Sequence, residues 1–186
     1  MTNKYRRILV LGSNSFTGSN YINETLSKNN KIVGVSRSIE PPRFMLPYKE
    51  NKHVNNFTFI RLDLNNKMTK LFSLIDNFKP DLVINFAAQG EVRNSWIYPD
   101  QWYQTNCNLI INLTKKLINN KYLKKYVSIS TPEVYGSNLK KIKESNNFNP
   151  STPYAASKLA GDLHLITLHK KYNFPVVFTR SANVYG

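Results

Sequence analysis

Residues 8–18, ILVLGSNSFTG, decide the fold. The four apolar residues 8–11 predict a buried strand, residues 17–29 predict a helix, and a turn bounded by Gly12 and Gly18 joins them. In a doubly wound sheet this turn binds a dinucleotide pyrophosphate, because its amides and the helix dipole favour negative charge. Ser15 stands where a middle glycine is usual, which departs from the pattern. The residues predicted to bind a dinucleotide here are Gly12, Asn14, Ser15, Phe16, Thr17 and Gly18.

The same alternation of strand and helix continues along the chain. Further strands are expected at 32–35, 57–60, 82–84, 126–129 and from 175 to 178, with helices at 67–78, about 100–120 and 153–172. This order predicts an α/β fold, a Rossmann-like doubly wound parallel sheet with helices on both faces. Residues 37–56 and 137–152 are expected to be loops. We predict one domain over residues 1–186, ending abruptly after the last strand.

Composition excludes several other classes of protein. The 186 residues are 41% hydrophobic, which supports one real core, and the longest apolar runs are too short for a membrane span or a signal peptide. We therefore expect a cytoplasmic protein without a membrane partner. One cysteine and three scattered histidines argue against a disulfide framework and against a metal site. The net charge of +15 raises nucleic acid as a partner, but the lysines are spread over many segments, so no nucleic-acid partner is expected.

Two residues after the second and third strands bear on the cofactor. An acidic residue after the second strand would bind a ribose 2′-hydroxyl and favour NAD, but the sequence there is Ser36-Arg37-Ser38. Arg37 is suited to a 2′-phosphate, so NADP is slightly favoured over NAD; the alternative is a solvated loop arginine. Asp63 follows the third strand and is placed to accept a hydrogen bond from an adenine amino group. Its alternative role is to cap a helix over residues 65–78.

The reactive pair is expected to be Tyr154 and Lys158, which lie four residues apart on the predicted helix 153–172. Ser151 or Thr152 can cap this helix, and Pro153 suits its first position. The positive end of the helix dipole and the lysine charge favour a phenolate, so we expect the pKa of Tyr154 to fall below its usual value of about 10.

A second tyrosine–lysine pair, Tyr48 and Lys52, lies in the loop-rich segment, and we expect it to be unrelated to the site.

The ends of the fourth and fifth strands face the same crevice as the glycine turn. After the fifth strand, Thr131 offers a hydroxyl to a substrate oxygen and Glu133 offers a carboxylate base. The alternative for Glu133 is an exposed loop acid. After the fourth strand, Ala87 and Ala88 are small enough for a flat cofactor ring to lie against the backbone.

Together these segments resemble the extended short-chain dehydrogenase/reductase superfamily, in particular its NAD(P)-dependent nucleotide-sugar epimerases and dehydratases. The resemblance covers nearly the whole chain and rests on six ordered motifs: the glycine turn, Asp63-Leu64, residues 85–89, residues 130–136, Tyr154 with Lys158, and residues 179–186. It implies that Leu64, Ala87, Ala88 and Gln89 also bind the cofactor, together with Arg37, Asp63, Tyr154 and Lys158. It further implies that Thr131, Glu133, Tyr154 and Lys158 are catalytic and that Gln89, Thr131 and Asn183 bind a nucleotide-diphosphate sugar.

The segment Thr131-Pro132-Glu133 is similar to the 4,6-dehydratases of dTDP-glucose and GDP-mannose, whereas 4-epimerases usually lack this glutamate. The resemblance implies that Tyr154 takes the proton of the sugar 4-hydroxyl and that Glu133 takes the proton at C5, before water leaves from C6. Pro132 replaces the aspartate acid of the dTDP-glucose enzymes and cannot donate a proton. A 4-epimerase and a UDP-glucuronate decarboxylase remain alternatives, as does a non-enzymatic dinucleotide sensor or a fragment.

The resemblance also predicts two features of the complete protein. Relatives are longer, so the C-terminal region that binds the nucleotide sugar is expected to be absent from this sequence, and this portion alone is expected to be inactive. A homodimer is expected through the helices at 100–120 and 153–172, which carry the apolar residues Leu109, Leu113, Leu117, Leu163 and Ile166.

Overall fold

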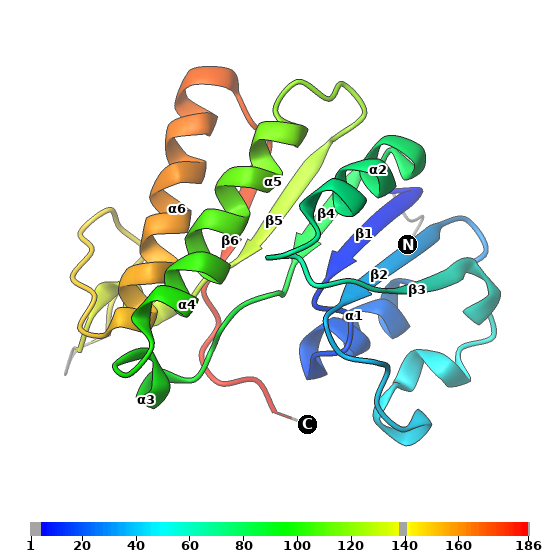
Figure 1. Ribbon diagram of the computed structural model, residues 1–186, viewed down its shortest axis with the longest axis horizontal. Helices are drawn as coiled ribbons and strands as arrows, with labels where there is room; N and C mark the ends of the chain where they lie inside the picture. Colours follow the sequence, from blue (N-terminus) through cyan, green and yellow to red (C-terminus); the bar gives the residue numbers. More distant parts are fainter. Residues whose placement is uncertain (1–4, 138–140, 186) are drawn as a thin grey trace.

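A computed structural model describes residues 5–137 and 141–185 of the chain. Within these ranges six parallel strands form one sheet in the order β3-β2-β1-β4-β5-β6 (Figure 1). The strands are β1 (Arg7–Leu11), β2 (Lys31–Ser36), β3 (Phe57–Arg61), β4 (Leu82–Asn85), β5 (Lys125–Ile129) and β6 (Val176–Thr179). The predicted Rossmann-like parallel sheet is confirmed.

Helices connect the strands as the sequence alternation predicts. They are α1 (Phe16–Thr25), α2 (Met68–Phe78), α3 (Val92–Ser95), α4 (Pro99–Tyr103), α5 (Leu109–Leu117) and α6 (Pro153–Tyr172). The helix predicted at about 100–120 spans residues 99–117 without a break, but a π-helical turn, η4 (Gln104–Asn108), lies between its α-helical parts α4 and α5. The helix predicted at 17–29 ends at Thr25, where the next residue, Leu26, has an extended backbone.

The first predicted loop segment contains short 3-10 turns, and another lies just before the second. Residues 37–56 hold η1 (Arg43–Met45), η2 (Pro47–Glu50) and η3 (Val54–Asn56), and η5 (Pro132–Tyr135) follows β5. Tyr48 in η2 is fully buried, and its hydroxyl donates to the Glu40 carboxylate at 2.7 Å. The Tyr48–Lys52 pair therefore lies in a structural segment packed on α1, away from the predicted site.

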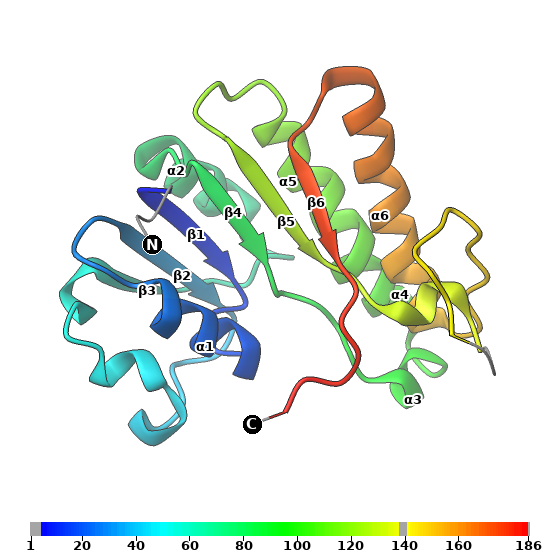
Figure 2. The same cartoon turned by 180° about the vertical axis from the view of Figure 1, so that it is seen from behind.

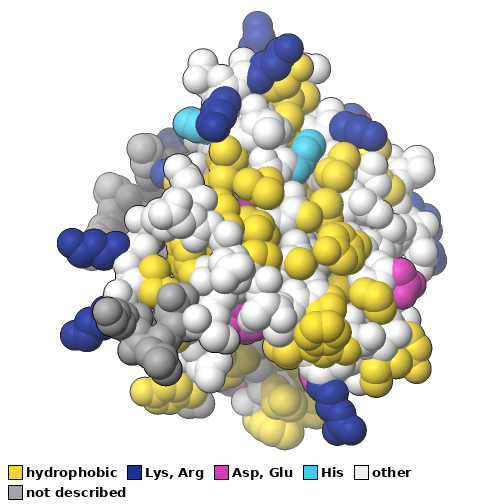
Figure 3. Space-filling view, turned by 90° about the vertical axis from the view of Figure 1, so that its left-hand side faces the viewer, with side chains coloured by type: hydrophobic (Ala, Val, Ile, Leu, Met, Phe, Trp, Pro, Cys, Tyr) yellow, Lys and Arg dark blue, Asp and Glu magenta, His cyan; other side chains and the backbone are white. Residues whose placement is uncertain are grey.

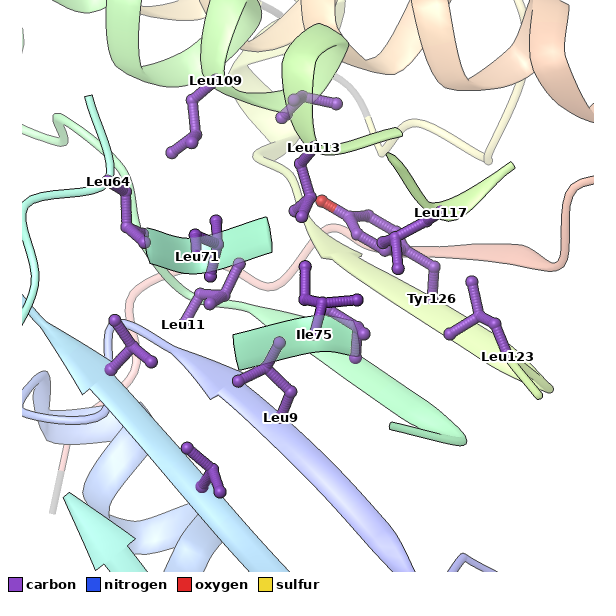
Figure 4. Packing of buried hydrophobic residues seen from close by; sticks show 14 of the residues in the cluster. Leu9, Leu11, Leu64, Leu71, Ile75, Leu109, Leu113, Leu117, Leu123 and Tyr126 are labelled. Carbon is purple, nitrogen blue, oxygen red and sulfur yellow. The ribbon is translucent and has the colours of Figure 1, made fainter. Parts of the chain in front are cut away.

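The two faces of the sheet bury alternate residues of each strand. Leu9 and Leu11 of β1 pack with residues of α2 and α5, as Figure 4 shows, whereas Ile8 and Val10 pack with Ile22 of α1. In the view from behind, α1 lies on the near face and α5 and α6 lie beyond the sheet (Figure 2). Helices therefore lie on both faces, as predicted.

The apolar residues expected at a dimer interface divide into two groups. Leu109, Leu113 and Leu117 are buried in the chain's own core, so the prediction that they face a partner is wrong. They pack against β-strand residues because α5 lies directly on the sheet. Leu163 of α6 is 45% exposed, and Ile166 is partly buried.

The described residues contain neither a membrane-spanning helix nor a cluster of metal-ligating side chains. Residues 5–137 and 141–185 hold no helix that is both long and apolar enough to cross a bilayer. The same ranges hold no group of three His, Cys, Asp or Glu side chains arranged to ligate a metal ion.

Candidate active site

The glycine turn follows β1, which is the neighbour of β4 at the point where the strand order of the sheet reverses. Gly12 has a φ of +81°, and a Cβ there would lie 2.7 Å from the backbone nitrogen of Ala87, so only glycine fits. The Ser15 hydroxyl donates to the Gly12 carbonyl at 2.8 Å and accepts from the Gly18 amide at 3.0 Å. Ser15 is therefore the N-cap of α1, which explains why serine replaces the usual middle glycine.

A first hollow of about 380 Å³ opens beside this turn. Nine residues predicted to bind the cofactor line it: Gly12, Asn14, Ser15, Arg37, Asp63, Leu64, Ala87, Ala88 and Gln89. The Oδ1 atoms of Asn14 and Asn65, which also line the hollow, are buried without a hydrogen-bond partner among the described residues. Unsatisfied acceptors beside a glycine-lined turn are what a dinucleotide would require, so the residues present fit NAD or NADP.

Arg37 and Asp63 line the hollow in different ways. Arg37 is exposed in the loop after β2, to which the Asn14 side chain is tied by a 2.9 Å bond to the Ile39 carbonyl. Asp63 accepts from the Asn65 amide at 3.0 Å and from the Asn66 side chain at 2.9 Å. It therefore orders the turn after β3 and does not cap α2, whose N-cap position holds Lys67.

A second hollow of about 430 Å³ adjoins the first, and Ser15 lines both. Thr131, Glu133, Tyr154 and Asn183 all line it, from η5, α6 and the segment after β6, together with Phe16 and Thr17 of α1. The second hollow therefore brings together these four candidate catalytic and substrate-binding residues, whereas Lys158 does not line it. Gln89 lines the first hollow, and its neighbour Gly90 lines the second.

Tyr154 lies in the first turn of α6, as predicted. The Thr152 hydroxyl caps this helix by accepting from the Ala155 amide at 3.1 Å, and Pro153 takes the first position. Burial raises the pKa of the Tyr154 phenol, the hydrogen bond with Thr131 lowers it, and the charge of Glu133 raises it. The expectation of a lowered phenol pKa is wrong for this structure, because desolvation of a phenolate is the largest of these effects.

Lys158 lies one helical turn after the tyrosine and is buried, with 6% of its surface exposed. Its ammonium donates to the Ile129 carbonyl at the end of β5, at 2.6 Å. Burial lowers the pKa of Lys158 to about 8, against the raising effect of Asp162.

The sequence analysis missed Asn106, in the π-helical turn η4. Its side chain accepts from the Gln89 amide and donates to the Gln89 carbonyl and to Ser157 Oγ, each at 3.0 Å. Asn106 thus fixes the loop after β4 against α6. No local sequence signal marks Asn106, because its neighbours Gln104, Thr105 and Asn108 are polar as well. Its π-helical turn is a structural signal, since such turns frequently mark functional sites.

The sheet, the glycine turn and the adjoining hollows define a dinucleotide-binding domain with a candidate reactive site at its edge. The family model described as "NAD dependent epimerase/dehydratase family" matches residues 8–186, and the chain belongs to this family. A probable dTDP-glucose 4,6-dehydratase of Sinorhizobium fredii is 30% identical over 97% of the chain and 54% of its own length. The human dTDP-D-glucose 4,6-dehydratase is 31% identical over 97% and 52%. The chain therefore spans about half the length of these relatives.

Solved structures agree with this assignment. The UDP-N-acetylglucosamine 4-epimerase of Methanobrevibacter ruminantium, in complex with UDP-N-acetylmuramic acid, matches with a TM-score of 0.84 and 29% identity, over 97% of this chain and 56% of that one. The UDP-glucuronic acid 4-epimerase of Bacillus cereus, in complex with UDP-glucuronic acid and NAD, matches with a TM-score of 0.79 and 31% identity, over 96% and 57%.

Proposed function

We propose that the complete protein is an NAD(P)-dependent nucleotide-sugar 4,6-dehydratase, a lyase that forms a 4-keto-6-deoxy sugar nucleotide. One observation carries this proposal: Glu133 shares the second hollow with Thr131 and Tyr154, next to the hollow that fits the cofactor. A dehydratase needs a base for the proton at C5, whereas a 4-epimerase leaves C5 unchanged. The similarity to curated dTDP-glucose 4,6-dehydratases supports the same function.

The roles of the residues follow from their positions. The redox chemistry, removal of hydride from C4 and its return to C6, belongs to the nicotinamide cofactor when it is bound. Tyr154 accepts the proton of the sugar 4-hydroxyl, and Thr131 orients that hydroxyl and the phenol together. Lys158, one helical turn further along α6, supplies the positive charge that stabilises the phenolate. Asn183 contributes to sugar binding from the segment after β6.

Glu133 and Pro132 determine how water leaves. Once the 4-ketone has formed, Glu133 accepts the acidified C5 proton. Glu133 is also the one carboxyl group among the described residues that line the second hollow, and Pro132 has no proton to give. We therefore infer that protonated Glu133 gives its proton to the C6 hydroxyl, which leaves as water, and that C5 takes up a proton from solvent when hydride returns to C6. One residue thus serves as base and then as acid.

The test is Glu133→Gln in the complete protein, with Glu144→Gln as the matched control, because Glu144 is an exposed glutamate in the following loop. An amide is not a base at neutral pH, so turnover falls about 10²–10⁴-fold. Reduced cofactor accumulates in the absorbance spectrum, and the C5 hydrogen no longer exchanges with solvent. The control keeps full turnover. Full turnover of Glu133→Gln with a 4-epimeric product would refute the dehydratase assignment.

Nucleotide-sugar 4-epimerisation is the second candidate function, because the two solved structures compared above, at 29% and 31% identity, are 4-epimerases. Decarboxylation of a UDP-glucuronate and a non-enzymatic dinucleotide sensor are the remaining alternatives. Analysis of the product separates them: a dehydratase releases water, a decarboxylase releases carbon dioxide, an epimerase yields an isomer, and a sensor yields no product.

We propose NADP as the preferred cofactor, with NAD as the alternative. Arg37 lines the first hollow, and residues 36–38 carry no acid to bind a ribose 2′-hydroxyl. Against this, several similar structures contain NAD.

We also propose a homodimer for the complete protein. Figure 3 shows hydrophobic side chains gathering on the face that carries α6, and the exposed residues Leu163, Trp96 and Tyr103 belong to α6 and the neighbouring α3–α4 region. A cytoplasmic location and the absence of a nucleic-acid partner stay predictions from composition.

A further inference from the structure

A buried carboxylate, Asp162, lies on α6 one helical turn beyond Lys158. Only 1% of its side chain is exposed. Tyr154, Lys158 and Asp162 are spaced four residues apart, so they follow one another along the same face of the helix. Asp162 lies deeper in the molecule than the second hollow and does not line it.

Two residues fix this carboxylate. Its Oδ2 atom accepts from Ser130 Oγ at 2.5 Å and from Arg180 Nη2 at 3.1 Å. Ser130 follows β5 and directly precedes Thr131, while Arg180 follows β6 and directly precedes Ser181. Asp162 therefore joins α6 to the two segments that supply Thr131 and Asn183 to the second hollow.

The Arg180 guanidinium is itself held in place. It lies over the rings of Tyr135, Phe148 and Phe178 at 5.4–5.6 Å, and Nη1 donates to the Tyr135 hydroxyl at 3.2 Å. The buried cluster thus holds two cations, Lys158 and Arg180, around one anion. Removal of the anion would leave two buried positive charges close together.

We propose that Asp162 is a positioning residue that keeps the buried Lys158 ammonium charged, one helical turn from Tyr154, with Ser130 and Arg180 holding its carboxylate in place. This inference rests on the role proposed above for Lys158.

The physical reason is the balance of charge in a dry environment. Burial penalises the ammonium and has already lowered the pKa of Lys158 to about 8. The opposite charge of Asp162 acts against this effect, so that Lys158 stays mostly protonated at neutral pH. Burial raises the pKa of Asp162, and the Ser130 hydrogen bond and the charges of Arg180 and Lys158 only oppose this rise. The 3.1 Å ion pair with Arg180 is the contact that holds the carboxylate as the anion of the cluster.

Other titratable or charged groups occur on α6 itself and on five elements packed against it, η5, η4, α4, α3 and α5. They are Tyr154 and His164 of α6 itself, Glu133 and Tyr135 of η5, Cys107 of η4, Asp100 and Tyr103 of α4, Arg93 of α3, and Lys115 and Lys116 of α5. Arg180 follows β6. The negative charge of Asp162 also raises the pKa of the Tyr126 phenol on β5. Among the described residues, Asp162 is the group that raises the pKa of Lys158.

The test measures Lys158 directly in the 186-residue chain. Lysine is labelled with ¹³C at Cε, and the Lys158 resonance is identified by its loss in Lys158→Met. In the unmodified chain it titrates near pH 8. In Asp162→Asn the midpoint falls by about one pH unit or more, because an opposite charge close by has been removed. Asp76→Asn, which breaks the surface pair of Asp76 with Lys116, is the matched control and leaves the midpoint unchanged.

The direction of the shift separates this role from a merely structural one. If Asp162 only held the packing together, its loss would admit water to Lys158, and the midpoint would rise toward the ordinary value of about 10.4. An unchanged or raised midpoint therefore overturns the proposal. If Asp162→Asn does not fold, Asp162→Ser decides: it also removes the negative charge, with a smaller side chain, and the same fall is expected.

A second measurement keeps this inference separate from the proposed function. In the complete protein, the alkaline limb of the pH–rate profile moves to lower pH in Asp162→Asn, and it stays in place in Asp76→Asn. If the resonance shifts but the reaction catalysed is not a dehydration, the dehydratase proposal fails and the role of Asp162 stands. If the enzyme is a dehydratase and the resonance does not shift downward, the role of Asp162 fails.

Discussion

Asn106→Ala tests the link between the cofactor hollow and α6. The substitution removes three side-chain hydrogen bonds, two to the Gln89 backbone and one to Ser157, at a position that is 1% exposed. Each such bond contributes about 1 kcal/mol net, so the free energy of unfolding should fall by about 3 kcal/mol. In a domain of this size that loss lowers Tm by about 6–12 °C. NAD should also bind more weakly, because Gln89 lines the hollow and is no longer held.

The assay is urea denaturation of the 186-residue chain, with cofactor affinity measured by calorimetry on the same samples. Asn108→Ala is the matched control, because Asn108 lies two residues further in the same π-helical turn and is exposed. Its free energy of unfolding should change by no more than about 0.5 kcal/mol. A loss below about 1 kcal/mol for Asn106→Ala would show that the three bonds do not stabilise the fold as argued.

Three further predictions concern the cofactor, the substrate and assembly. NADP should bind at least as well as NAD, and Arg37→Asp should shift the preference toward NAD. Arg93→Asp, on the exposed surface of α3, should leave the preference unchanged. If competition titrations show the same NADP-to-NAD ratio in both variants, Arg37 is a solvated loop residue. The 186-residue chain should bind cofactor but bind nucleotide sugars poorly, because it spans only about half its relatives, and micromolar sugar-nucleotide binding in calorimetry would contradict this. Light scattering of the complete protein should show a dimer that Leu163→Asp dissociates and Ser73→Asp, on the exposed surface of α2, does not. A monomer at tens of micromolar before substitution would refute the dimer.

Most of the fold could be predicted from the sequence because strands and helices leave strong local patterns. The run at 8–11 and the glycine turn place β1 and α1, and the helix predicted at 153–172 coincides with α6. The cap at Thr152 and the proline that follows it are local signals, and they determine where α6 begins.

The features that escaped prediction depend on contacts between distant segments. The π-helical turn η4 contains Asn106, whose side chain bonds to Gln89 and Ser157 from elsewhere in the chain. The pKa of Tyr154 depends on how deeply the phenol is buried, and a helix position alone does not reveal that depth. The dimer prediction failed for α5 because an apolar helix face has the same pattern whether it covers a sheet or a second subunit.

The two hollows draw on different lengths of chain, and this has a consequence for protein synthesis. The cofactor hollow is lined by residues no later than Leu109, whereas the second hollow requires residues as late as Val184. At a synthesis rate of about 5–20 residues per second, the first can form several seconds before the second. A ligand that binds only folded chain stabilises it by mass action. We therefore expect cellular NAD or NADP to stabilise the nascent chain on the ribosome before its catalytic groups have been synthesised.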